Sequence, residues 1–241
     1  MTGHDDGEIR IWNPKDLKIA REIASPFPNL APLACSPRGR SLAFFQSENG
    51  LRLWNTVRQE FELEVVNSGA IRKAIFSPSG KTLITASNDG FVRIMDAASG
   101  DNLQVLSLPF QTIGPLTVSR DERCLAAPYV EDGEILPNIR IWELGTERQF
   151  EGLNAHPIWI VALAFSPDSK TLASGSLDGT ARLWELSNLH EPIAEFHGRR
   201  MAVNSLAFSP NGTRLAVSGD HGETSLWDLV SLQQVRTLSD G

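Results

Sequence analysis

The sequence predicts an all-β fold built from small repeated sheets, and three observations support this. An apolar strand ending in tryptophan, or once in methionine, recurs every 41 to 47 residues. Ser-Pro turns and Asp-Gly or Asn-Gly turns recur in step with it. A period in this range, made of short strands and tight turns, is typical of a radial or stacked repeat architecture. The recurring position holds Trp12, Trp54, Met95, Trp142, Trp184 and Trp227.

Residues 156–198 show one repeat most completely. Three aliphatic and β-branched runs and a looser fourth are separated by Pro, Asp, Ser and Gly, which is typical of strands joined by tight turns. The turn SPDS places proline where its fixed φ suits a β-turn, and Asp-Gly suits the turn of a hairpin. The repeat therefore predicts a four-stranded sheet, with strands at 160–165, 171–176, 180–186 and 193–196.

Composition fits a soluble, cytoplasmic protein. The chain has 241 residues, of which 41% are hydrophobic and 21% charged, and it contains no apolar run long enough to span a membrane. Its first residues show no secretory signal. The formal charge is −7 and the basic residues are scattered, which argues against nucleic acid as a partner. Cys35 and Cys124 lie in different repeats, where free thiols are expected rather than a disulfide or a metal pair.

These residues resemble the WD40 repeat proteins, in particular bacterial WD40 arrays, over nearly the whole chain. Trp227-Asp228 is the literal Trp-Asp pair, and five related pairs stand in register with the Ser-Pro and Asp-Gly turns. The resemblance implies a β-propeller, in which four-stranded blades surround a central channel. The related pairs are Trp12-Asn13, Trp54-Asn55, Met95-Asp96, Trp142-Glu143 and Trp184-Glu185.

The predicted organisation is a single propeller domain, 1–241, with five complete blades and an N-terminal half blade. Counting back from Trp12 leaves the first repeat without its first strand and most of its second, so we expect Glu8–Trp12 to have no inner partner strand. Open strand edges there invite association with another chain. Two arrangements agree with this count: a six-bladed ring and an incomplete seven-bladed ring. The expected blades are 1–25 (partial), 26–66, 67–108, 109–155, 156–198 and 199–241.

The resemblance also implies a hydrogen-bonded tetrad in the 156–198 blade. The family often ties a blade together through His, Ser or Thr, Asp and Trp, and the spacing matches at His156, Ser174, Asp178 and Trp184. His, Ser and Asp could also suggest a hydrolase triad. Their repeat register and the need of buried polar groups for partners favour a structural role.

A candidate partner-binding rim follows from aligning the repeats with one another. The position before the first buried apolar residue of each repeat, and the position after it, vary in chemistry. Trp159 stands out, because it is the tryptophan outside the repeat register and tryptophan is a frequent interface anchor; the alternative is that its ring packs over the neighbouring loop. The candidate rim residues are Trp159, Val161, Arg72, Thr112, Asn29, Asn204 and Arg200.

The function expected from these patterns is a non-catalytic scaffold that presents a propeller rim to protein or peptide partners. We expect no cofactor and no metal, because the five histidines show no ligand spacing and phosphate-binding loops and nucleophile elbows are absent. One alternative is an architectural segment that completes a larger propeller in trans. The other is a propeller enzyme, which needs polar side chains that converge near the channel.

Overall fold

The computed structural model describes most of the chain. The chain divides into two compact units, Met1–Leu106 and Ser107–Gly241, and each is described by itself. The described residues are 2–3, 8–12, 18–24, 33–108, 114–130, 136–153, 155–197 and 202–238.

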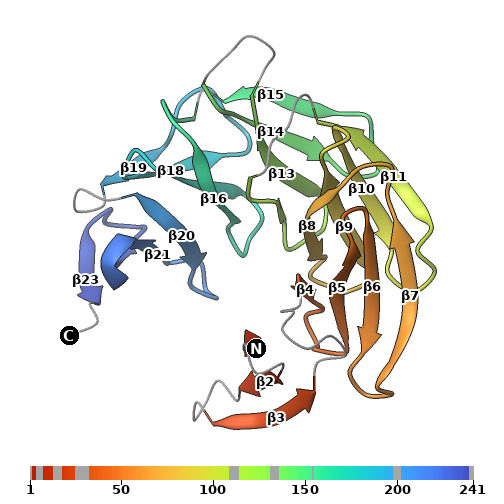
Figure 1. Cartoon of the computed structure of the whole chain (residues 1–241). Coiled ribbons are helices and arrows are strands. Elements are labelled where there is room, and N and C mark those ends of the chain that lie inside the picture. Colours follow the sequence, from red (N-terminus) through yellow and green to blue (C-terminus); the bar gives the residue numbers. More distant parts are fainter. Residues whose placement is uncertain are drawn as a thin grey trace. The chain divides into compact units, whose positions relative to one another are not determined.

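The first unit consists of three antiparallel sheets, in each of which neighbouring strands follow one another along the chain (Figure 1). The first sheet holds β1 (Thr2–Gly3), β2 (Glu8–Trp12) and β3 (Ile19–Ala24). The second holds β4 (Ala34–Cys35), β5 (Ser41–Ser47), β6 (Gly50–Asn55) and β7 (Glu60–Val66). The third holds β8 (Ile71–Phe76), β9 (Thr82–Ser87), β10 (Phe91–Asp96) and β11 (Asn102–Ser107).

The first sheet differs from the sequence prediction in one respect. We expected Glu8–Trp12 to lack an inner partner, and this is wrong: Thr2 pairs with Arg10 and Gly3 with Ile9. A strand of two residues has no alternating pattern from which the sequence could have predicted it.

The second unit consists of three four-stranded antiparallel sheets. The first holds β12 (Thr117–Val118), β13 (Cys124–Tyr129), β14 (Asn138–Glu143) and β15 (Gln149–Leu153). The next holds β16 (Ile160–Phe165), β17 (Thr171–Ser176), β18 (Thr180–Glu185) and β19 (Ala194–His197). The last holds β20 (Val203–Phe208), β21 (Arg214–Gly219), β22 (Thr224–Asp228) and β23 (Gln234–Leu238), with a 3₁₀ turn at Asp220–Gly222. The prediction of an all-β chain with five four-stranded blades of the propeller type is confirmed.

The Ser-Pro turns between the first two strands of a blade share one hydrogen-bond pattern. In the turn after β16, the hydroxyl of Ser166 accepts a hydrogen bond from the backbone N–H of Thr171 at 3.0 Å and donates one to Asp168 at 2.6 Å. The fourth turn residue adopts a positive φ, which glycine provides at Gly80 and Gly212, and Ser169 takes the same conformation with a φ of 60°. The turn therefore depends on the serine hydroxyl and on a fourth residue, usually glycine, that adopts a positive φ.

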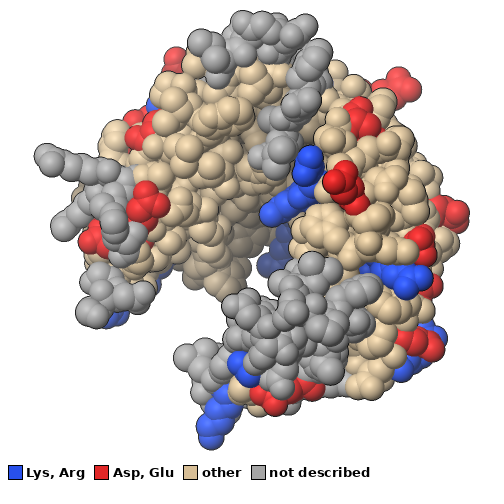
Figure 2. All heavy atoms as spheres, viewed as in Figure 1, with Lys and Arg blue, Asp and Glu red and all other residues tan. Residues whose placement is uncertain are grey.

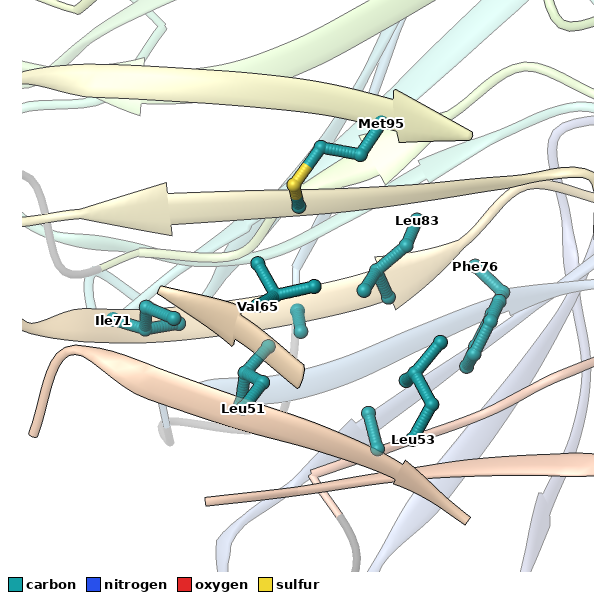
Figure 3. Packing of buried hydrophobic residues seen from close by; sticks show 9 residues of the cluster. Leu51, Leu53, Val65, Ile71, Phe76, Leu83 and Met95 are labelled. Atoms are coloured by element: carbon teal, nitrogen blue, oxygen red, sulfur yellow. The ribbon is translucent and has the colours of Figure 1, made fainter. Parts of the chain in front are cut away.

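Neighbouring sheets within each unit pack face to face through apolar side chains. In the first unit, Leu51, Leu53 and Val65 of one sheet meet Ile71, Leu83 and Met95 of the next (Figure 3). In the second unit, the same arrangement joins β16–β19 to β20–β23 through Leu183, Phe196 and Val203. Among the described residues, no helix is long and apolar enough to cross a membrane.

Candidate functional site

The sheet β16–β19 brings four predicted side chains into one hydrogen-bonded chain. The Nδ1 atom of His156 lies 3.0 Å from the carboxylate of Asp178, and its Nε2 atom lies 2.8 Å from the hydroxyl of Ser174. The indole N–H of Trp184 donates to the same hydroxyl at 2.9 Å. Repeat spacing explains the meeting, because Ser174 lies on β17, Trp184 on β18, and the other two in the loops at one end of the sheet.

Burial fixes the protonation of this network. Desolvation lowers the pKa of His156 below its usual value, against the opposing effect of Asp178, so the imidazole is neutral at neutral pH. The pKa of Asp178 is also lowered: its burial alone would raise it, but hydrogen bonds from Thr180 and His156 outweigh that effect. Every group is satisfied when Nδ1–H donates to Asp178 and Ser174 donates to Nε2.

Ser174, His156 and Asp178 make the same contacts as the residues of a hydrolase triad. The surroundings of Ser174, however, differ from those of a catalytic nucleophile. A catalytic serine must reach a substrate carbonyl. Ser174 is 0% exposed, and its oxygen accepts the indole N–H of Trp184. The geometry can therefore hold a loop to a sheet, and it gives a substrate no access to the hydroxyl.

The network fixes the loop that precedes β16. His156 is held by its ring, and the guanidinium of Arg182 donates to the carbonyl oxygen of Ala155. The hydroxyl of Ser176 donates to the carbonyl of Ile158 at 3.3 Å, and the backbone N–H of Leu177 donates to the carbonyl of Trp159 at 3.0 Å. Residues 155–159 are thus held to β17, β18 and the turn between them by the ring of His156 and by three backbone carbonyl groups.

Three large apolar side chains are exposed on this fixed loop and the adjoining turn. Trp159 is 58% exposed, Ile158 43% and Leu177 41%. The bond between Leu177 and Trp159 places the turn and the loop side by side. We call Ile158, Trp159 and Leu177 the Trp159 patch.

Sequence reasoning found Trp159 but missed Ile158 and Leu177. A signal for Leu177 was present, because the same position of the β-turn holds the polar residues Glu48, Asn88 and Asp220 in other repeats. An apolar residue at a position that is otherwise polar and exposed is informative. No comparable signal distinguishes Ile158.

The other predicted rim residues are dispersed. Val161 is half-buried on β16, and Asn204, at the corresponding position of β20, is exposed and donates a hydrogen bond to Asp220 at 2.7 Å. Arg72 is exposed on β8, in the first unit. Asn29, Thr112 and Arg200 lie outside the described residues. A rim that joins all seven residues stays a prediction.

Other sheets keep only part of the His156 network. In β8–β11, Asn67 replaces the histidine and donates to Thr85 at 3.1 Å and Ser87 at 2.7 Å. Met95 takes the tryptophan position there and has no N–H to donate. Asp89 pairs instead with Arg93 at 2.7 Å.

Metal ligands, thiols and surface charges were the other features that could indicate a binding or catalytic site. In the described part of the chain, no group of three or more His, Cys, Asp or Glu side chains could hold a metal ion. Cys35 and Cys124 are free, half-buried thiols, and burial raises the pKa of each. Acidic and basic side chains lie interspersed on the face shown in Figure 2.

Comparison with known proteins identifies the repeats. The family model of the WD domain, G-beta repeat, matches residues 62–96, 147–185 and 190–228. Each match begins within or shortly before the last strand of one sheet and ends with the third strand of the next. The family repeat is therefore offset by one strand from the sheet.

Several named proteins are similar to this chain. The WD repeat-containing protein 91 homolog of Dictyostelium discoideum is 26% identical over 82% of the chain and 27% of its own length. Apoptotic protease-activating factor 1 of Rattus norvegicus is 27% identical over 70% of the chain and 13% of its own length. The guanine nucleotide-binding protein subunit beta of Oryza sativa subsp. indica is 22% identical over 79% of the chain and 53% of its own length. The chain thus spans between about an eighth and about half of these relatives.

Proposed function

The chain is a WD40-repeat protein, and we propose that it is a non-catalytic scaffold that binds a protein or peptide partner through the Trp159 patch. The observation that carries the proposal is the contrast between side chain and backbone at Trp159. The residue is 58% exposed, while the loop beneath it is held by the His156 network and by hydrogen bonds from Ser176 and Leu177.

A fixed loop favours binding for a physical reason. Association costs free energy when a partner must order side chains and loops, and a surface that is already ordered avoids much of that cost. Tryptophan adds a large apolar area, and it is among the residues most often found at interface hot spots. Ile158 and Leu177 flank it with further apolar surface.

The relatives support the same class of function. One of them is by its name a subunit of a guanine nucleotide-binding protein, so it acts within an assembly. The burial of Ser174 supports the non-catalytic part of the proposal. A fluorophosphonate probe, which labels reactive serines, should leave Ser174 unlabelled in the folded chain; labelling at Ser174 would contradict this.

The binding proposal is tested by affinity capture from a cell extract with three forms of the chain: wild type, Trp159→Ala and Val57→Ala. Val57 is the matched control, since it is 63% exposed and lies in the first unit, away from the patch in sequence and sheet. We expect Trp159→Ala to weaken retention of the captured partner by about thirtyfold or more, the loss typical of a hot-spot residue.

Folding is checked in the same samples by thermal unfolding. Trp159 is exposed, so its replacement by alanine should change the free energy of unfolding by no more than about 0.5 kcal/mol. Equal retention by all three forms would overturn the assignment of the patch.

A further inference from the structure

A groove lies at the opposite end of the sheet from the Trp159 patch. It has a volume of about 420 Å³ and is formed where sheets β16–β19 and β20–β23 meet at their Ser-Pro turns. Pro167 follows the end of β16, whereas Trp159 precedes its start. Six residues in a strand span about 20 Å, so the two surfaces are separate.

The lining of the groove combines polar and apolar residues, and the apolar ones come from several elements. Leu183 and Phe208 contribute from β18 and β20, and Leu229 from the loop after β22. Ile193, which precedes β19, is 54% exposed, and Val230, next to Leu229, is 86% exposed. Pro167 and Pro210 form the two turns that border the groove. Exposed aliphatic side chains beside a groove of this size are typical of a surface that receives apolar side chains.

One cation at the groove has no partner within the described chain. Arg120 lies on the Ser119 turn, which is joined to the β16–β17 turn by a hydrogen bond of 3.2 Å from the backbone N–H of Asp121 to Ser169. Arg120 is exposed, and its guanidinium makes no hydrogen bond or ion pair among the described residues. The groove therefore offers a cation that is free to bind a carboxylate.

The acidic group at the groove is engaged by its own turn. Asp168 accepts hydrogen bonds from the hydroxyl of Ser166 at 2.6 Å and from the backbone N–H of Lys170 at 3.1 Å. Asn211 is similarly engaged, because it accepts from Ser209 at 2.7 Å and from the hydroxyl of Thr213 at 3.0 Å. Arg120 is thus the charged side chain at the groove that has no hydrogen-bond or ion-pair partner among the described residues.

The first unit has a groove at the corresponding position, and its chemistry is different. That groove lies between β4–β7 and β8–β11, has a volume of about 740 Å³, and is lined by charged residues that include Arg58, Glu60, Glu62, Lys81 and Asp96. Arg58 pairs with both Glu60 and Glu62. A groove that combines several apolar side chains with one free arginine is therefore not a general result of packing two blades together.

We propose that the groove between β16–β19 and β20–β23 binds an extended peptide segment of a partner protein in which a large apolar residue stands beside an acidic one. The apolar residue enters between Leu183, Phe208 and Leu229, and the carboxylate pairs with Arg120. This surface goes beyond the Trp159 patch and does not depend on it.

The test is selection of a random-peptide phage library on the wild-type chain, followed by affinity measurement with the enriched peptides. We expect these peptides to carry Leu, Ile, Phe or Trp next to Asp or Glu. Arg120→Glu should weaken their binding about tenfold or more, because it places like charges together. Ile193→Asp should weaken binding by a similar factor, since it puts a charge beside the apolar side chains of the groove.

Two variants serve as controls. Trp159→Ala should leave peptide binding unchanged, which distinguishes binding in the groove from binding at the Trp159 patch. Lys81→Glu changes the same charge in the groove of the first unit and should also have no effect. Binding should weaken with added salt in the wild type, as for an exposed ion pair.

Several results would overturn the proposal. Enriched peptides without acidic residues, or peptides that bind Arg120→Glu as well as wild type, would remove the role of Arg120. Peptides lost only in Trp159→Ala would place the site at the Trp159 patch. Self-association in sedimentation velocity that Arg120→Glu abolishes would make a second copy of the chain the occupant, against the proposal.

Discussion

The sheets β16–β19 and β4–β7 carry a tryptophan at the same register position, but only one of them gives its N–H a partner. Trp184 stands opposite Leu172, and Trp54 opposite Leu42. Two residues beyond each leucine, one sheet has Ser174 and the other Phe44. Ser174 accepts the indole N–H of Trp184, whereas the buried Nε1 of Trp54 has no hydrogen-bond partner in the described structure.

The presence or absence of a partner for the indole N–H distinguishes two roles of tryptophan in these sheets. In both sheets the indole packs against apolar neighbours; Trp54, for example, meets the ring of Phe61 edge-on at 4.9 Å. In β16–β19 the indole also ends a polar chain that fixes the loop of the Trp159 patch. The repeat therefore keeps tryptophan for packing, and the polar network is a further feature that a single substitution can remove.

The largest effect is expected at the centre of the network. His156→Ala removes one hydrogen-bond partner from each of Ser174 and Asp178 in a buried site and also opens a cavity, so the free energy of unfolding should fall by about 3 kcal/mol. Asn67→Ala, at the equivalent position of β8–β11, should cost about half as much, because it removes neutral hydrogen bonds only. Urea unfolding of both variants measures the difference, and equal losses would contradict the special status of His156.

The two tryptophans should respond differently to the same change. Trp184→Phe removes a satisfied hydrogen bond, while Trp54→Phe removes an N–H that has none. The loss of stability should therefore be larger at Trp184 by about 1 kcal/mol, the net value of a hydrogen bond. Both variants lose similar ring area, so each is the control for the other in urea unfolding. A larger loss at Trp54 would reverse the comparison.

A smaller effect concerns pH. The folded pKa of His156 lies below the value of an unfolded chain, about 6.5, so the unfolded state binds more protons as the pH falls through that value. Stability should therefore be full above about pH 6.5 and decrease below it. The lowered pKa of Asp178 acts in the same direction at a lower pH, below its unfolded value.

His156→Gln should reduce the loss of stability below about pH 6.5, because glutamine does not titrate. Urea unfolding at about pH 7.5 and about pH 5.5, on either side of the unfolded pKa, measures it. His190→Gln is the control, since His190 is exposed in the loop between β18 and β19. A variant at position 156 that keeps the full pH dependence would show that another group is responsible.

Much of the fold could be predicted from local signals. Ser-Pro and Asp-Gly turns fix where strands end, and the apolar periodicity fixes which residues face the core; Ile71, Ile160 and Val203 are nearly fully buried at the equivalent position of three sheets. The spacing of His156, Ser174, Asp178 and Trp184 also selected four residues that the structure joins. The two-residue strand β1 has no such pattern.

The surfaces were harder to predict, because they combine residues from separate segments. Leu177 reaches the Trp159 patch through a turn whose contact with the loop is set by β-sheet pairing. The groove needs Arg120 from one sheet and Phe208 from another, and no sequence period links them. An exposed arginine without a partner is identified only when its neighbours are known.

The central claim is that the buried Ser174 serves Trp184 and His156 as a structural link. The most direct test is a double-mutant cycle with Ser174→Ala and Trp184→Phe, measured by urea unfolding. The two substitutions should cost less together than the sum of the single changes, with a coupling of about 1 kcal/mol. A coupling near zero would show that the hydroxyl and the indole stabilise the blade independently, and would contradict the account.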